Sequence, residues 1–185
     1  MTHDISDRSG GFVVRDAGDA DMGAVRRIYA YYVERALATF EETAPSVAEM
    51  SARRRHALDF GAPYLVAERE GRVLGYCYAA PYHARSGYRF TLEDSVYVDE
   101  DARGRGVGGA LLGALIARCE AGPWRQMVAV VGDSGNQASI ALHRRHGFVH
   151  VGTLVSVGFK LGRWVDTPIM QRALGVGDAT PPGGI

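Results

Sequence analysis

The sequence predicts an α/β (α+β) protein with a mixed sheet of seven strands flanked by helices. Strand-like and helix-like segments follow one another in the order β-α-α-β-β-β-α-β-α-β-β. Residues 126–131 are a continuous apolar run, which is typical of a strand buried on both faces. A glycine-rich loop at 103–109 joins an alternating strand to an amphipathic helix. These three observations place helices on both sides of one sheet.

The elements follow from local signals taken in order along the chain. The sequence Phe-Val-Val-Arg at 12–15 predicts a short first strand, and Asp19 or Asp21 can cap a helix that runs to about residue 35. Ser46 and Glu49 have the spacing of a capping box, which predicts a second helix to about residue 59. Alternation and apolar periodicity predict strands at 64–70, 73–80, 91–98, 126–131, 148–157 and 164–172, and helices at 107–119 and 136–146.

Length and composition favour a single domain. The chain has 185 residues, of which 46% are hydrophobic and 23% are charged, as in an ordinary globular protein. Residues 1–11 are polar and residues 175–185 are rich in glycine and proline, so both ends are expected to be disordered tails. The folded domain is therefore expected at 12–174.

Charge and cysteine content exclude several classes of partner. The 21 basic and 21 acidic residues cancel, so no general field attracts nucleic acid or an acidic membrane. Cys77 and Cys119 each fall in a predicted element, which favours buried, reduced thiols. The sequence shows neither an apolar run of membrane-spanning length nor a signal peptide, so a cytoplasmic location is expected.

The glycine loop is the strongest functional signal. Glycines let backbone N–H groups approach a ligand, and the first N–H groups of the following helix lack partners, so the segment predicts an anion site. A P-loop is excluded, because no Lys-Ser or Lys-Thr pair follows Gly108 and the one lysine of the chain is Lys160. The dinucleotide fingerprint fits loosely, with Asp133 as its acidic residue. The pattern [QR]-x-x-G-x-[GA], which begins at Arg103, fits at every fixed position.

This pattern and the order of the elements resemble the GNAT N-acetyltransferases. Ala-Thr-Phe-Glu at 38–41, Ala-Pro-x-x-x-Arg at 80–85 and Gly-Phe-Lys-x-Gly-x-Trp at 158–164 are similar to the phosphinothricin and methionine sulfone/sulfoximine branch of that family. The resemblance implies a sheet whose strands at 91–98 and 126–131 splay apart, with acyl-CoA in the notch. It also implies acetyl-CoA as cosubstrate, no metal, a homodimer, and a small amino acid analogue whose α-amine is acetylated.

The resemblance assigns catalysis to two residues. Glu93 matches the glutamate of the family's Glu-Ser-Thr-Val-Tyr-Val and is the expected base for the substrate ammonium, with a pKa raised by desolvation. Asp94 is adjacent but points to the opposite face of the strand. His143 stands where many relatives have a tyrosine, so it either protonates the leaving thiolate or helps to deprotonate the amine.

The same resemblance gives the binding residues. A backbone N–H near Val98, where the family's strand bulges, would stabilise the charge that develops on the thioester oxygen. Arg103 and Arg105 either bind phosphate or are solvated, and Asn136 either touches the pantetheine arm or only caps a helix. The residues expected to bind the cosubstrate are Val96, Tyr97, Val98, Arg103, Gly104, Arg105, Gly106, Val107, Gly108, Gly109 and Asn136.

The acceptor site is expected at Phe40, Arg85 and Tyr88, with Phe40 as an aromatic wall and Arg85 as the reader of an anionic group. His83 stands where a lysine is associated with the herbicide-resistance enzymes, so methionine sulfone or sulfoximine is as open as phosphinothricin. Two alternatives remain at this stage. The acceptor could be a protein N-terminus, a polyamine or an aminoglycoside, or the protein could be a non-catalytic acyl-CoA-binding regulator.

Overall fold

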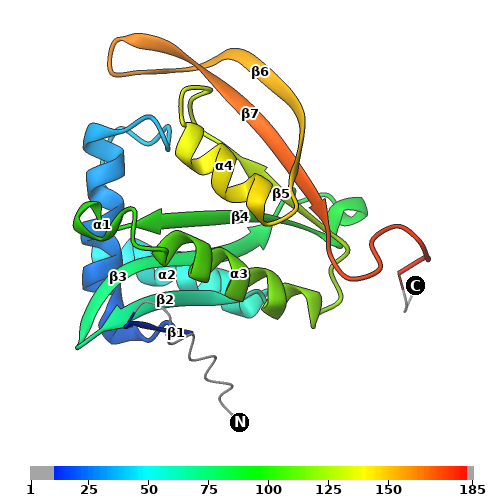
Figure 1. Cartoon of the computed structure of the whole chain (residues 1–185), viewed down its shortest axis with the longest axis horizontal. Coiled ribbons are helices and arrows are strands. Elements are labelled where there is room, and N and C mark those ends of the chain that lie inside the picture. The colour runs from blue at the N-terminus through cyan, green and yellow to red at the C-terminus, as the bar shows by residue number, and fades with distance from the viewer. Residues whose placement is uncertain (1–10, 183–185) are drawn as a thin grey trace.

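The computed structural model describes residues 11–182, and Figure 1 shows one twisted sheet with helices on both faces. Within this range there are seven strands, four α-helices and three short 3-10 helices. The strands are β1 (Val13–Asp16), β2 (Tyr64–Arg69), β3 (Arg72–Pro81), β4 (Thr91–Val98), β5 (Gln126–Val130), β6 (Val149–Lys160) and β7 (Arg163–Ala173). The helices are α1 (Met22–Arg35), α2 (Val47–Asp59), α3 (Val107–Glu120), α4 (Gln137–Arg145), η1 (Asp19–Asp21), η2 (Ser86–Tyr88) and η3 (Glu100–Ala102).

The strand order is β1-β2-β3-β4-β5-β7-β6. Neighbouring strands are antiparallel except for β4 and β5, which are the one parallel pair in the described part of the chain. This arrangement confirms the predicted mixed sheet of seven strands. Strand β6 runs to Lys160, beyond the expected end at residue 157. The strand is longer because residues 158–160 continue to pair with β7 after an irregularity between Leu154 and Gly158.

Local capping explains where the second helix begins. The Ser46 hydroxyl accepts from the Glu49 N–H at 3.2 Å, and the Glu49 carboxylate accepts from the Ser46 N–H at 2.6 Å. This reciprocal pair is the predicted capping box, and it satisfies two backbone donors that the helix cannot pair itself.

Two apolar cores cover the two faces of the sheet. Helix α3 packs on one face through Leu111, Leu112 and Leu115, all fully buried, and α4 adds Ile140 and Leu142. Helices α1 and α2 pack on the other face, where α1 contributes an apolar stripe. That stripe consists of Met22, Val25, Ile28, Tyr29 and Val33. The two faces of β4 therefore look toward different helices.

The two expected tails fall largely outside the described residues. Of the segments 1–11 and 175–185, the structure describes residue 11 and residues 175–182. In the second of these, Gly177 N–H donates to the Leu174 carbonyl at 2.9 Å, and Ala179 N–H donates to the Val176 carbonyl at 3.1 Å. Over residues 11–182, no helix is both long enough and apolar enough to cross a membrane.

Candidate active site

The sheet opens between β4 and β5. Their parallel pairing runs from Thr91 opposite Gln126 to Asp94 opposite Ala129 and then stops. Residue Val130 of β5 pairs with Ile169 of β7, whereas the last four residues of β4 keep only their β3 partners. This divergence confirms the predicted notch between the two parallel strands, and it leaves a free backbone edge on β4.

The expected bulge near Val98 was wrong. Leu92 to Val98 pair with Pro81 to Gly75 in unbroken register, so β4 stays regular against β3. The notch forms without a bulge because β5 leaves β4 to follow β7.

The free edge of β4 is partly closed by Tyr32 of α1. The Tyr32 hydroxyl donates to the Val98 carbonyl at 2.7 Å and accepts from the Val98 N–H at 3.2 Å. Backbone groups two residues apart in a strand point to the same side, so the N–H and C=O of Val96 also face the notch. Those of Tyr97 face β3. Within the predicted trio, the backbone groups of Val96 are thus the ones left for an added partner.

The glycine loop leads directly into α3. Gly104 and Gly106 have φ angles of +73° and +80°. Residues other than glycine adopt this left-handed conformation only at a cost in conformational free energy. Gly106 is the N-cap of α3, and no side chain caps the helix there. The N–H groups of the first turn, from Val107 to Gly109, are therefore left to a ligand or to water. Together with the helix dipole, these N–H groups have the polarity that the predicted anion site requires.

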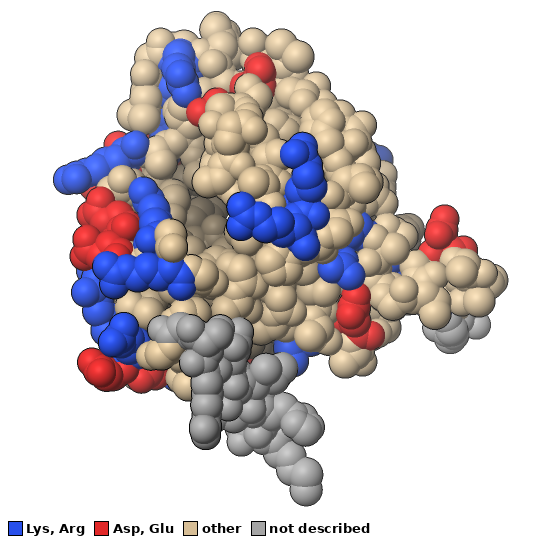
Figure 2. All heavy atoms as spheres, viewed as in Figure 1, with Lys and Arg blue, Asp and Glu red and all other residues tan. Residues whose placement is uncertain are grey.

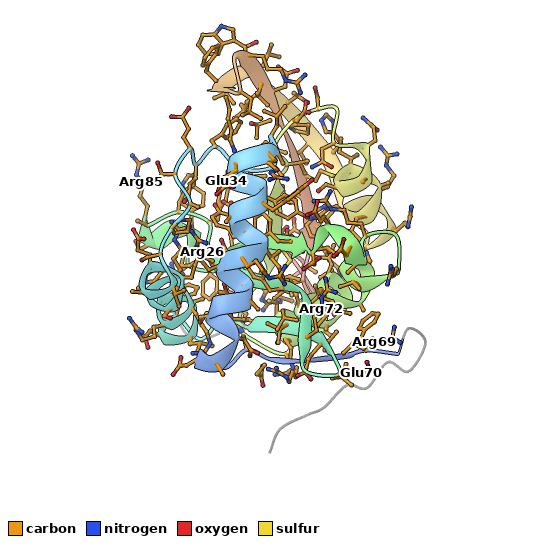
Figure 3. The ribbon with its side chains drawn as sticks, turned by 90° about the vertical axis from the view of Figure 1, so that its left-hand side faces the viewer. Arg26, Glu34, Arg69, Glu70, Arg72 and Arg85 are labelled. Atoms are coloured by element: carbon orange, nitrogen blue, oxygen red, sulfur yellow. The ribbon has the colours of Figure 1, made fainter. Side chains whose placement is uncertain are left out.

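The two arginines of the loop have different surroundings. The Arg103 guanidinium lies over the rings of Tyr31 and Tyr32, 4.8 and 5.1 Å from their centroids. The residue is exposed, but these contacts tie the glycine loop to α1. Arg105 lines a surface pocket with Arg69 and Arg72, which lie near each other in Figure 3. Figure 2 shows basic side chains on both sides of a hollow on the face that carries α3 and α4.

Asn136 is the N-cap of α4. Its side-chain oxygen accepts from the Ser139 N–H at 3.2 Å, and its Nδ2 donates to the Gly132 carbonyl at 3.5 Å. Of the two roles considered from the sequence, the capping role is present in the structure, and the long Nδ2 contact leaves room for a second acceptor.

Glu93 lies on β4 at the point where the notch begins, next to the last pair of β4 and β5. Its side chain is half-buried and faces the α1–α2 side of the sheet. Burial, followed by the charge of Asp94, raises the pKa of Glu93 to about 7. A carboxyl group with this pKa exchanges its proton near neutral pH, which is what a base for an ammonium requires.

Asp94 and His143 form a buried pair on the other face. Nε2 of His143 lies 3.0 Å from Oδ2 of Asp94, and Nδ1 lies 2.8 Å from the Ser139 carbonyl oxygen. The His143 side chain is 6% exposed and the Asp94 side chain is 1% exposed. A carbonyl oxygen only accepts, so the short contact to Ser139 favours a proton on Nδ1, and Nε2 shares a hydrogen bond with the Asp94 carboxyl group. Burial lowers the pKa of His143, but the bond to Asp94 outweighs it and the net pKa is raised.

The two predicted catalytic residues are not in contact. Consecutive side chains of a strand point to opposite faces, so Glu93 faces α1 and α2, while Asp94 faces α4, the helix that carries His143. Glu93 and His143 therefore lie on opposite faces of the sheet.

The predicted acceptor residues come from two places. Phe40 follows α1 and packs its ring over Gly158 of β6. Arg85 precedes η2 and is exposed, and Figure 3 shows it directed outward at the margin of the molecule. Tyr88 ends η2, where it makes edge contacts with Tyr82 and His83 at 5.7 and 5.0 Å. The structure does not bring Phe40 into contact with Arg85 or Tyr88.

Two site residues were missed in the sequence. Tyr32 and Asp94 both take part in the contacts of β4. Tyr32 lies outside the motifs that carry the family resemblance, and Asp94 lies within one of them but was given no role. The alternation of the strand gave the face of Asp94 but could not give its partner. Across residues 11–182, no group of three or more His, Cys, Asp or Glu side chains could hold a metal ion.

Comparisons with known proteins agree with this geometry. The model of the acetyltransferase (GNAT) family matches residues 25–148. The chain belongs to the GNAT acetyltransferase family. It is therefore an N-acetyltransferase that uses acetyl-CoA, and the glycine loop, the notch and the parallel pair are parts of the GNAT fold.

Individual relatives cover most of both chains. A phosphinothricin N-acetyltransferase of Alcaligenes faecalis is 59% identical over 169 residues, which are 91% of this chain and 86% of that protein. An L-methionine sulfoximine/L-methionine sulfone acetyltransferase of Pseudomonas aeruginosa is 43% identical over 162 residues, 87% and 94% of the two chains. The crystal structure of a phosphinothricin acetyltransferase from Sinorhizobium meliloti in complex with AcCoA is 47% identical, covers 95% of each chain and has a TM-score of 0.91.

Proposed function

We propose that this enzyme acetylates the α-amine of a small amino acid that carries a phosphinate, sulfone or sulfoximine group. The relatives named above act on substrates of this kind. The observation that carries the proposal is the Glu93 carboxyl group, which stands where β4 and β5 part and has a pKa of about 7.

Glu93 is proposed as the base. An amino acid enters as an ammonium, which has no lone pair until a proton is removed. Glu93 takes this proton, directly or through water. The amine nitrogen then attacks the thioester carbon and a C–N bond forms. The C–S bond breaks, the sulfur leaves with the bonding pair as a thiolate, and the nitrogen releases its second proton to solvent to give the neutral amide.

His143 is proposed as the acid on the opposite side of the notch. Glu93 lies on the other face of the sheet, and the proton that His143 Nε2 shares with Asp94 is the one that can pass to the thiolate. This favours protonation of the thiolate over help with the amine, the two roles that the sequence left open. The hydrogen bond to Asp94 raises the pKa of His143 and so favours the protonated imidazole, although burial opposes this.

The free edge of β4 and the start of α3 are proposed to hold the cosubstrate. The backbone of Val96 has the free N–H and C=O that an extended pantetheine arm can pair with. The N–H groups from Val107 to Gly109 suit the diphosphate, and Arg105 adds charge beside them. The Val98 N–H already donates to the Tyr32 hydroxyl, so the pantetheine arm would compete with Tyr32 for that N–H.

We also propose that the enzyme is a homodimer that works in the cytoplasm. Strand β6 is the edge of the sheet, and its exposed apolar side chains include Val149, Val151, Val155, Val157 and Phe159. A row of this kind on a strand edge favours association with a second copy. The two buried free thiols, Cys77 and Cys119, suit a reducing compartment.

The acceptor is tested by release of free CoA. Purified protein is incubated with acetyl-CoA and, separately, with methionine sulfone, methionine sulfoximine, phosphinothricin, spermidine and an aminoglycoside. We expect turnover with one or more of the first three and none with the N-acetylated form of the same compound. Turnover with the polycations alone would move the acceptor to the cationic class, and CoA binding without any turnover would favour the regulator.

A further inference from the structure

Lys160 is bound entirely by backbone carbonyl groups of another part of the chain. Its Nζ lies 3.2 Å from the Tyr32 oxygen, 2.9 Å from that of Ala36 and 2.8 Å from that of Thr39. The residue is 2% exposed. An ammonium has three N–H donors, and the three carbonyl oxygens take all of them. Lys160 therefore joins the end of β6 to the end of α1 and has no donor left for an anionic substrate.

The residue type at this position is informative. The chain has 21 basic residues, and Lys160 is the one that is not arginine. An ammonium is a compact charge whose donors spread in three dimensions, whereas a guanidinium directs its donors within one plane. Three carbonyl groups that converge on one point suit the first geometry and not the second. This gives a physical reason why a chain that otherwise uses arginine has lysine here.

Two glycines bring the same segment against the sheet. The segment from Ala36 to Glu41, here called the α1 loop, places the Phe40 ring where a Cβ at Gly158 would lie. Likewise, a Cβ at Gly132, just after β5, would overlap the backbone of Leu37 and Ala38. The α1 loop is thus seated on β6 and on the end of β5 at positions where only glycine fits.

Hydrogen bonds continue from the α1 loop toward β4. The Thr39 hydroxyl lies 2.9 Å from that of Tyr29, which donates to Glu41 at 2.8 Å. The Tyr29 ring packs edge-on against Tyr97 of β4, with centroids 5.0 Å apart. Tyr97 shares its face of β4 with Glu93, so the α1 loop is tied to the side of the notch where the amine is proposed to react.

The segments 38–41 and 158–164, which carried the closer resemblance in the sequence, meet in this cluster. Figure 1 shows the β6–β7 hairpin rising above the C-terminal end of α1. We propose that Lys160 is a positioning residue of the acceptor site: it holds the α1 loop on the sheet and so fixes Phe40 beside the reacting amine. The inference rests on the proposed function, since it takes the acceptor to bind on the Glu93 side.

Kinetics of Lys160→Met and Lys160→Arg test the proposal. Both should raise the KM for the acceptor, and kcat/KM for it should fall by about 10- to 100-fold, as for a misplaced binding group, with the KM for acetyl-CoA unchanged. Gly158→Ala, which displaces Phe40 without touching Lys160, should show the same pattern. Arg163→Met removes a neighbouring hairpin charge, which pairs with Asp133 instead, and should behave like the wild type. Full acceptor affinity in Lys160→Arg, or equal loss for both substrates, would overturn the proposal.

A second measurement uses the wild-type protein and does not depend on turnover. An amine-acylating reagent can react only with Lys160 and the α-amine of the chain, and mass spectrometry reports the two sites separately. We expect slow labelling of Lys160, slowed further by the N-acetylated acceptor, which has no amine of its own, and not by CoA. The α-amine serves as the internal reference. A labelling rate of Lys160 that does not change when the acetylated acceptor is added would contradict a link to the acceptor site. A wild-type enzyme that does not acetylate the acceptor would instead count against the proposed function.

Discussion

Glu93 and Asp94 show how neighbouring carboxyl groups on one strand acquire different chemistry. Because side chains alternate along a strand, Glu93 faces α1 and α2. No basic side chain among residues 11–182 forms an ion pair with it there, and burial raises its pKa to about 7. Asp94 goes to the opposite face and pairs with the His143 imidazole at 3.0 Å. The charge of Asp94 in turn adds to the raised pKa of Glu93.

Replacing Glu93 by Gln should lower kcat/KM for the acceptor by about 10²–10⁴-fold and leave acetyl-CoA binding intact, since the base is lost and the glycine loop is untouched. In the wild type, the same rate should fall as the pH drops through about 7, because Glu93 is then protonated. A pH profile measures both effects. Glu100→Gln, which removes an exposed carboxyl just beyond the same strand, is the control and should retain the wild-type profile.

The substitution Glu93→Gln should also stabilise the protein at alkaline pH. The folded state raises the pKa of Glu93 from its ordinary value of 4.5 to about 7 because it favours the protonated carboxyl group. The stability of the fold that depends on this protonated form is fully present below pH 4.5 and is lost as the pH rises through about 7. Above pH 7, Glu93→Gln should therefore raise the free energy of unfolding by roughly 3 kcal/mol, and at pH 5 by much less. Thermal unfolding at the two pH values checks this. An equal shift at both would show that the charge of Glu93 is not the cause.

Asp94→Asn tests the buried pair. The amide carries no charge to hold the imidazolium, so the pKa of His143 should fall, and kcat should decline at a lower alkaline pH than in the wild type. The stability that the pair provides is present below pH 6.5 and is lost as the pH rises through the raised pKa, so the variant should lose most stability in acid. Nitrogen chemical shifts of the His143 ring report its protonation. Ser139→Ala, which keeps the carbonyl partner, should change neither readout, and an unchanged ring in Asp94→Asn would contradict the pairing.

At the scale of the elements, the start of α3 combines a strained turn with a row of free N–H groups. Gly106 is needed for the φ of +80° that directs the chain from the loop into the helix. The helix begins without a side-chain cap, which suits a site whose partner is an external anion.

Gly106→Ala should weaken acetyl-CoA binding because the loop relaxes out of the left-handed conformation, and it should cost about 1–2 kcal/mol of stability. Gly61→Ala is a matched control. Gly61 has a φ of +82°, and like Gly106 it has nothing within 4 Å of an added Cβ, but it follows α2. The two variants should lose similar stability, and only Gly106→Ala should raise the dissociation constant for acetyl-CoA in calorimetry. A similar loss of affinity in both would point to a general effect of destabilisation.

Elements and motifs with local signals were predictable, and contacts between distant segments were not. The capping box at Ser46 and the glycines after Arg103 each involve residues close together in the sequence. The starts of α2 and α3 could therefore be predicted. The bond from Tyr32 to Val98 joins residues 66 positions apart, and the bonds from Lys160 to α1 join residues more than 120 apart. No periodicity encodes such pairs, because they depend on how the helices pack on the sheet. The bulge expected near Val98 was wrong for the same reason, since the path of β5 opens the notch.

At the scale of the whole molecule, most residues of β6 are exposed. Val155 is 75% exposed on the edge of the sheet, and the hairpin rises clear of the helices in Figure 1. An edge strand with a row of apolar side chains is a surface for pairing with another copy.

Val155→Asp should convert a homodimer into a monomer, because a carboxylate cannot be buried against a second apolar strand without a partner. Light scattering after size-exclusion chromatography should give twice the chain mass of 20.0 kDa for the wild type and the chain mass for the variant. Val176→Asp, at a valine that is also exposed but lies beyond β7, should remain dimeric. A wild type that elutes as a monomer would remove the dimer from the proposed function.

The single buried lysine has a chemical consequence for an enzyme that handles an activated acetyl group. Thioesters acylate free amines slowly without any catalyst, and most proteins offer many such amines on their surface. Here the surface positive charge is carried by guanidinium groups, which stay protonated and are poor nucleophiles, while the one side-chain amine is enclosed by carbonyl oxygens. The enzyme therefore binds its cosubstrate without offering it an exposed lysine amine.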